Sequence, residues 1–193
     1  YVVNASSEEN RLVVNGMSAS NRGSVFANSG IVVSVTPKDV KEYVKQPELS
    51  LMKFQQECER KMYMQNQVAP AQRISDFVVG KKSHNIASTS YPSGLQACNM
   101  KDYLPKIVAE HLKEGFKVFD RRIKGFISNQ ATMIGLESRT SSPVRILRDK
   151  DSLQHPQISM LFPCGEGAGY AGGITSSAID GVNAAIKISQ ILK

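Results

Sequence analysis

The stretch PCGEGAGYAGGI, residues 163–174, decides the fold that this sequence favours. The apolar run Ile158–Cys164 leads into it and predicts a buried strand, and apolar residues at helical spacing follow it. Glycines between a strand and a helix let the backbone turn sharply and approach a ligand, while free N–H groups at the helix start favour negative charge. We therefore predict a strand, a glycine loop (Gly165–Gly173) and a terminal helix. The apolar helix positions are Ile174, Ala178, Ile179, Val182, Ile186 and Ile191.

Residues 167–172 fit the pattern G-x-G-x-x-G of dinucleotide-binding loops. The complete fingerprint also needs a second strand after the helix and an acidic residue about 20 positions further on. Neither follows before Lys193. We therefore expect this strand, loop and helix to complete a sheet that is begun elsewhere.

A second kind of cofactor contact has the same strand, turn and helix form. Glu166 could accept hydrogen bonds from ribityl hydroxyls, and the amides of Gly172, Gly173 and Ile174 could stabilise negative charge at the N1/O2 edge of a reduced flavin. Alternatively, the glycines only permit tight packing of the helix on the strand. The spacing alone leaves both interpretations open.

The first half of the chain combines strand-like and helical patterns. The β-rich pieces Tyr1–Val3, Arg11–Val14 and Gly30–Val35 are separated by Asn, Ser and Gly clusters and predict an antiparallel sheet. Apolar residues recur at helical spacing over Leu51–Gln65, which predicts an amphipathic helix. Residues 78–98 lack periodicity and predict a surface connection.

A second helical pattern starts at Asn99 and runs to Gly125, with Gly115 as a candidate break. His111 lies on or near its apolar face, which favours a packed core histidine over a catalytic one. Two more strands are predicted at Ala131–Glu137 and Pro143–Leu147.

Composition excludes several classes of protein. The chain has 193 residues of which 41% are hydrophobic, which fits a packed globule and not a disordered tail. The three cysteines, Cys58, Cys98 and Cys164, are odd in number and far apart, so neither a disulfide framework nor a metal site is expected. No apolar run reaches the roughly 18 residues of a membrane span. Motifs of serine hydrolases, zinc proteases and P-loop proteins are missing from the sequence, and no catalytic side chain is assigned.

The formal net charge of +7 is concentrated in the middle of the chain, since residues 101–150 carry 11 basic and 6 acidic side chains. This band is either a solvated face or a non-catalytic binding module for nucleic acid or an acidic partner. The sequence contains no Trp and few aromatics near these charges, so base stacking on nucleic acid has little support. The residues of such a module would be Arg121, Arg122, Lys124, Arg139, Arg145 and Arg148.

Four blocks carry a family resemblance that covers essentially the whole chain. They are VVNGMS (13–18), APAQR (69–73), ESRTSSPVRI (137–146) and PCGEGAGYAGGI (163–174), with Asp180-Gly181 following in order. The sequence resembles the FAD-dependent dehydrogenases of bacteria and plastids, which are FAD/NAD(P)-binding oxidoreductases with a two-domain flavoprotein fold. The resemblance implies an α/β protein with an α+β insert. Residues 1–130 would form a substrate-side insert domain with antiparallel strands and helices, and 131–193 the return segment of a Rossmann-like FAD-binding domain.

The resemblance also implies site residues. The cofactor-binding set is Gly165, Glu166, Gly167, Ala168, Gly169, Gly172, Gly173 and Ile174. The substrate-binding set is Arg139, Thr140, Ser141, Ser142 and Arg145, whose guanidinium groups suit a carboxylate or phosphate, with Asn15, Met17, Ser18 and Arg22 as further members. Each substrate segment has an alternative interpretation as an ordinary turn, the first between strands and the second in a hairpin.

The function implied is transfer of a hydride or electrons between FAD and an unidentified small-molecule substrate in the full-length parent, with NAD(P)H as a candidate electron donor. The sequence begins at Tyr1 and lacks the N-terminal fingerprint for the ADP half of FAD, so we expect a fragment. Its expected partner is the missing N-terminal half, and without it we expect self-association, no activity and no bound FAD. The resemblance places the parent in a bacterial cytoplasm or a plastid stroma, away from membranes.

Overall fold

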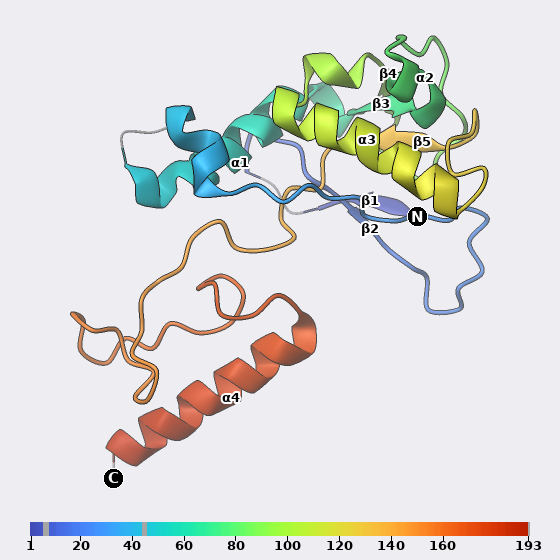
Figure 1. Cartoon of the computed structure of the whole chain (residues 1–193). Coiled ribbons are helices and arrows are strands. Elements are labelled where there is room, and N and C mark those ends of the chain that lie inside the picture. The colour runs from blue at the N-terminus through green and yellow to red at the C-terminus, as the bar shows by residue number, and fades with distance from the viewer. Residues whose placement is uncertain (6–7, 44–45, 193) are drawn as a thin grey trace. The chain divides into compact units, whose positions relative to one another are not determined.

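The computed structural model describes residues 1–5, 8–43 and 46–192, and the chain divides into two compact units. Unit 1 comprises Tyr1–Val35 and Gln55–Ser138, and unit 2 comprises Thr36–Phe54 and Arg139–Lys193. Helices and small sheets occur together, so the predicted mixture of helices and strands is confirmed as an α+β architecture (Figure 1).

The strands of unit 1 form small sheets of local and distant segments. β1 (Val2–Asn4) pairs antiparallel with β2 (Val14–Gly16), which confirms the predicted antiparallel pairing near the N-terminus. β3 (Ala69–Arg73) lies between β4 (Leu95–Ala97), to which it is parallel, and β5 (Thr132–Ile134), to which it is antiparallel. β3 and β4 come from segments without a strand pattern, so the predicted surface connection over residues 78–98 is wrong where β4 forms.

Helices pack around this second sheet. α1 (Ser50–Met62) confirms the predicted amphipathic helix, with its apolar stripe ending in buried Met62. α2 (Ile74–Val79) contacts α3 (Lys106–Arg122) through Phe77 and Phe116, whose rings meet edge to face at 5.9 Å. The fully or nearly buried core side chains of unit 1 include Leu12, Met62, Ala69, Phe77, Met100 and Phe116.

α3 differs from its prediction at both ends and in the middle. It begins at Lys106 and not at Asn99, because Pro105 disfavours helical backbone in the residue before it. It continues through Gly115, whose cost of roughly 1 kcal/mol is offset by the burial of Phe116. His111 is exposed, and its Nδ1 lies 2.8 Å from the Ile107 carbonyl oxygen, so the core assignment of this histidine is wrong.

The predicted strand Gly30–Val35 is extended chain without a ladder. Ile31 and Val33 pack against the core of unit 1, whereas Val32 between them is exposed. The alternation is that of a strand, but none of the described segments exchanges a ladder of backbone hydrogen bonds with it. Side-chain periodicity alone therefore does not distinguish a strand from a packed extended loop.

Unit 2 contains few regular elements. Short 3₁₀ turns, η1 (Pro37–Tyr43) and η2 (Pro47–Leu49), precede α1, and the long α4 (Ile174–Ile191) confirms the predicted terminal helix. The predicted strands Pro143–Leu147 and Ile158–Cys164 are not formed. An isolated strand leaves its N–H and C=O groups unpaired, and no described segment of unit 2 offers a neighbouring strand.

Residues near 158–164 instead fold back on themselves. The amide of His155 donates to the Leu161 carbonyl oxygen over 2.8 Å, and Met160 has a positive φ of 62°. Ile158, Met160 and Leu161 are exposed as a result. The prediction that this run is buried is therefore wrong for the chain by itself.

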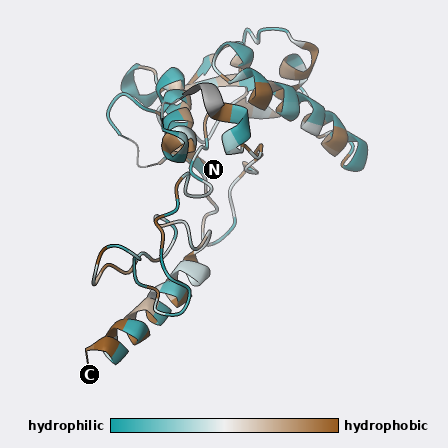
Figure 2. Ribbon diagram, turned by 60° about the vertical axis from the view of Figure 1, so that its left-hand side comes forward, coloured by the Kyte–Doolittle hydropathy of each residue, from teal (hydrophilic) through white to brown (hydrophobic). Residues whose placement is uncertain are grey.

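The apolar face of α4 is also exposed. Ile174 is 93% exposed, and Ile179, Val182, Ile186 and Ile191 each keep about half of their surface open. Hydrophobic positions recur along this helix (Figure 2), and Ala184 is its buried residue. The helix thus forms as predicted, but most of its apolar stripe has no covering among the described residues.

Candidate functional site

The glycine loop is a closed turn that ends at the start of α4. The amide of Gly169 donates to the Glu166 carbonyl oxygen (2.9 Å), and the amide of Tyr170 donates to that of Gly165 (3.0 Å). Gly165 and Gly169 have φ values of +74° and +84°, a region that side chains disfavour. These two glycines are therefore required by the backbone of the loop itself.

Gly169 is also required by space. A Cβ atom there would lie 2.7 Å from the Val144 carbonyl oxygen and 3.1 Å from Cα of Arg145. By contrast, a Cβ at Gly167 or Gly172 would meet nothing within 4 Å, and one at Gly173 would meet only Ser176 Oγ at 3.7 Å. The φ values of these three lie outside the left-handed region, so nothing in the described chain requires glycine there.

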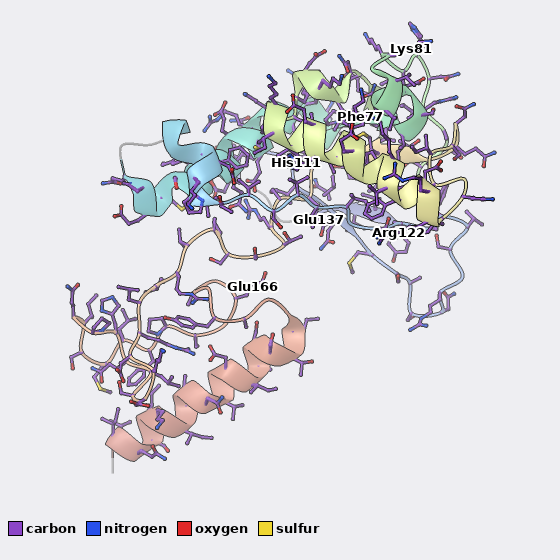
Figure 3. All side chains as sticks on the ribbon, viewed as in Figure 1. Phe77, Lys81, His111, Arg122, Glu137 and Glu166 are labelled. Atoms are coloured by element: carbon purple, nitrogen blue, oxygen red, sulfur yellow. The ribbon has the colours of Figure 1, made fainter. Side chains whose placement is uncertain are left out.

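The N-terminus of α4 is open to a ligand. Gly173 is its N-cap residue, no side chain caps the first turn, and the amide of Ser177 donates to the Gly173 carbonyl oxygen over 2.9 Å. The amides before Ser177 lack intrahelical acceptors by geometry. Glu166 lies on the loop that leads to this helix (Figure 3), and its exposed carboxylate has no side-chain partner among the described residues.

The segment 142–146 lies against the glycine loop. Ser142 Oγ donates to the Gly167 carbonyl oxygen (3.2 Å), Arg145 Nε donates to that of Gly169 (3.0 Å), and the Ile146 amide donates to that of Ala168 (3.2 Å). The structure therefore brings two residues of the predicted substrate set, Ser142 and Arg145, to the predicted cofactor loop.

A shallow depression of about 300 Å³ opens beside this contact. Ser142, Arg145 and Gly169 line it together with apolar residues such as Pro47 and Leu51. This size is at the lower end for small-molecule sites. Glu48 also lines the depression, which therefore combines an apolar wall with one guanidinium group and one carboxylate.

The other predicted substrate residues are placed differently. Arg139, Thr140 and Ser141 are exposed at the start of the second segment of unit 2. Asn15, Met17, Ser18 and Arg22 belong to unit 1, where Asn15 pairs with Val3 in the β1–β2 hairpin and the Met17 amide donates to the Tyr1 carbonyl oxygen. A role of these residues in binding a substrate stays a prediction.

A known protein family matches most of this chain. A family model described as "FAD-dependent protein, C-terminal domain-like" matches residues 1–140. The chain belongs to this family. The matched range of this FAD-dependent protein C-terminal domain ends beside Ser138, the last residue of unit 1.

A relative extends the similarity beyond the matched range. The chain is 43% identical over 194 residues to an uncharacterized protein of Clostridium beijerinckii, and the alignment covers 98% of this chain and 36% of the relative. The chain thus spans about a third of the length of that relative. Because only a few residues are left uncovered, the alignment includes the glycine loop.

Sequence reasoning missed a cluster around Arg148. Its guanidinium forms a two-pronged ion pair with Asp180 of α4, with N···O distances of 2.8 and 2.9 Å, and stacks 3.7 Å from the centre of the Tyr170 ring. The hydrogen bonds between Arg148 and Asp180 hold the pKa of the Asp180 carboxyl below its usual range and raise the pKa of the Arg148 guanidinium. Arg148 is therefore committed to Asp180, which removes it from the basic module considered as the alternative.

Within the described residues, no group of three metal-ligating side chains occurs, and no helix is long and apolar enough to cross a membrane.

The cysteines of this domain are expected to differ sharply in reactivity. Burial raises the pKa of the Cys58 thiol to about 12 and that of Cys98 to about 11, whereas Cys164 is exposed. Because the thiolate is the reactive form, titration of the native chain with a disulfide reagent at neutral pH should modify Cys164 alone. All three should react in denaturant, and Cys164→Ser should abolish the native reaction. Rapid native modification of Cys58 or Cys98 would contradict the burial of these side chains.

Proposed function

We propose that this chain is the segment of an FAD-dependent oxidoreductase that contacts the flavin through the glycine loop. The observation that carries the proposal is that Gly167, Gly172 and Gly173 lack any internal requirement for glycine. Glycine in the open interior of a loop lowers stability through its chain entropy. Close approach of a ligand to the backbone explains the absence of side chains at these positions, and membership of a family named for FAD dependence indicates which ligand.

The residues present fit such a cofactor. Glu166 has a free carboxylate for the hydroxyls of a ribityl chain, and the uncapped start of α4, with the amides of Gly173 and Ile174, offers positive potential to a negatively charged edge. Gly165, Ala168 and Gly169 shape the loop. FAD, when bound, would supply the hydride or electron transfer, so no side-chain nucleophile is needed.

We place the substrate on the side of the loop where Ser142 and Arg145 line the depression. Arg145 keeps its terminal nitrogens available, because it contacts the described chain through Nε and by stacking 5.0 Å from the centre of the Tyr170 ring. In the parent, residues 131–193 would complete a Rossmann-like FAD-binding domain and residues 1–130 would form the substrate side. The run Ile158–Cys164 would become a strand there by pairing with a sheet edge.

The proposal is tested first by Glu166→Ala in the full-length parent. The purified parent should show the visible absorbance bands of flavin, and the variant should bind FAD about tenfold or more weakly, because it lacks an acceptor for charge-assisted hydrogen bonds. Glu166→Gln should keep part of the affinity, since its amide oxygen still accepts. A parent without flavin bands and without affinity for added FAD would refute the proposed function, and unchanged affinity of the variant would refute the role of Glu166.

The proposed substrate-binding role of Arg139 and Arg145 is tested separately. Arg139→Ala and Arg145→Ala in the parent should leave the flavin content unchanged and lower kcat/KM by about tenfold or more, because a guanidinium–carboxylate contact is charge-assisted. Turnover with an identified substrate and flavin absorbance measure the two effects. Lys150→Ala is a suitable control, because Lys150 is an exposed cation of the same unit. Loss of flavin from either arginine variant would assign the cluster to the cofactor instead.

A further inference from the structure

The Arg148–Asp180 ion pair joins the entry and the middle of the glycine loop to α4. Arg148 Nη1 donates to the Pro163 carbonyl oxygen over 2.8 Å at the entry of the loop. The same guanidinium stacks on the ring of Tyr170, near the exit of the turn. One side chain therefore contacts the chain before and after Glu166.

Asp180 makes the complementary contact from the helix. Its Oδ2 accepts the Gly165 amide at 2.8 Å while its two oxygens hold the guanidinium of Arg148. Asp180 lies in the second turn of α4, so the carboxylate fixes the first residue of the loop relative to the helix start. The Tyr170 hydroxyl adds a bond of 3.0 Å to the Ile146 carbonyl oxygen, which ties the ring to the segment before Arg148.

We propose that Arg148 and Asp180 are positioning residues that set the shape of the glycine loop for its cofactor, an inference that rests on the proposed function. The pair lies in unit 2 and is nearly buried, with side chains 11% and 14% exposed. Among the described residues, the hydrogen bonds and the ring contact of the two side chains lead to the loop, to its flanks or to each other. The pair therefore determines where Glu166 and the amides at the start of α4 lie relative to one another.

Burial makes this arrangement sensitive to the loss of either member. Removing one charge leaves the other nearly buried and unpaired, which is far more costly than losing an exposed pair. Asp180→Asn keeps the shape of the side chain but removes the charge and one acceptor. Arg148→Lys keeps the charge but removes the two-pronged geometry and the planar stack on Tyr170.

The experiment uses the full-length parent freed of cofactor, with FAD as the titrant. Asp180→Asn should raise amide hydrogen exchange over residues 164–170 by about tenfold and weaken FAD binding by about tenfold or more. Arg148→Lys should change both quantities in the same direction by less. Exchange in α3 of unit 1 should not change, which distinguishes loosening of the loop from loss of the fold.

Asp151→Asn is the matched control, because it removes an exposed carboxylate in the same unit that makes no hydrogen bond or ion pair with the described residues. It should leave loop exchange and FAD affinity at the wild-type level. Wild-type FAD affinity in both Asp180→Asn and Arg148→Lys would overturn the positioning role, with or without faster exchange of the loop. A wild-type parent that binds no FAD would instead overturn the proposed function, which the glutamate variant tests independently.

Discussion

Gly169→Ala in the full-length parent is expected to disrupt the glycine loop and release FAD. Left-handed backbone costs an alanine about 1–2 kcal/mol, and a Cβ 2.7 Å from the Val144 carbonyl oxygen adds about 1–3 kcal/mol of overpacking. The crowding atom is backbone, so it cannot move aside as a side chain would. Denaturant unfolding and flavin absorbance measure the loss of stability and of cofactor.

Two other glycines supply the controls for this prediction. Gly181 lies inside α4, and a Cβ atom added there would meet nothing within 4 Å, so Gly181→Ala should leave stability unchanged or raise it by about 0.5–1 kcal/mol. Gly172→Ala should also keep the fold but weaken FAD binding, because only the ligand needs that space. If Gly169→Ala unfolds and binds FAD like Gly181→Ala, the crowded geometry of the loop is wrong.

The isolated 193-residue chain is expected to self-associate and to hold no FAD. Its sequence contains no complete fingerprint for the ADP half of the cofactor, so the flavin contacts alone would have to retain the ligand. The apolar stripe of α4 and the residues Ile158, Met160 and Leu161 all belong to unit 2, and these side chains are exposed. Such surfaces recruit other chains. Light scattering across concentrations and the absorbance spectrum measure the two outcomes.

Charge substitution locates the association surface. Ile179→Lys with Val182→Lys should convert the chain to a monomer, because burial of a lysine opposes association at an apolar contact. Val25→Lys is the matched control, since Val25 is 91% exposed in unit 1. A wild-type chain that is monomeric at all concentrations would count against this association surface. Flavin bands in the spectrum of the isolated chain would show that it holds FAD without the rest of the parent.

Local patterns predicted those elements whose stability is local. α1 and α4 satisfy their backbone hydrogen bonds within the segment, so periodicity of 3.6 residues was sufficient to place them. A strand requires a partner that its own sequence does not specify. Ile158–Cys164 and Gly30–Val35 have strand-like composition but pair with no described segment, and both were predicted wrongly.

The central strand β3 was missed for the opposite reason. Its sequence, APAQR, has no β-branched or aromatic residue and contains Pro70, which normally argues against an interior strand. Tertiary contacts override this preference. Ala69 and Ala71 are fully buried, and buried Gln72 donates from Nε2 to the Lys81 carbonyl oxygen and accepts the Met100 amide at Oε1.

The residues of the candidate site also differ in whether local sequence indicates them. The loop from Gly165 to Gly173 could be proposed from the sequence because its glycines lie close together, and Arg145 because it belongs to a short polar segment; their roles in binding stay predictions. Arg148 and Asp180 are 32 residues apart, and neither belongs to a pattern that indicates the other. Only the folded structure shows that Arg148 forms an ion pair with Asp180 and does not contribute to a basic surface.

The open surroundings of Gly167, Gly172 and Gly173 determine how the protein should respond to random substitution. A selection for expression or thermal resistance would accept side chains at these positions, and would reject them at Gly169. A selection for cofactor-dependent growth would reject them at all four. The positions at which the two selections disagree would therefore outline the surface that FAD covers, without any structure of the complex.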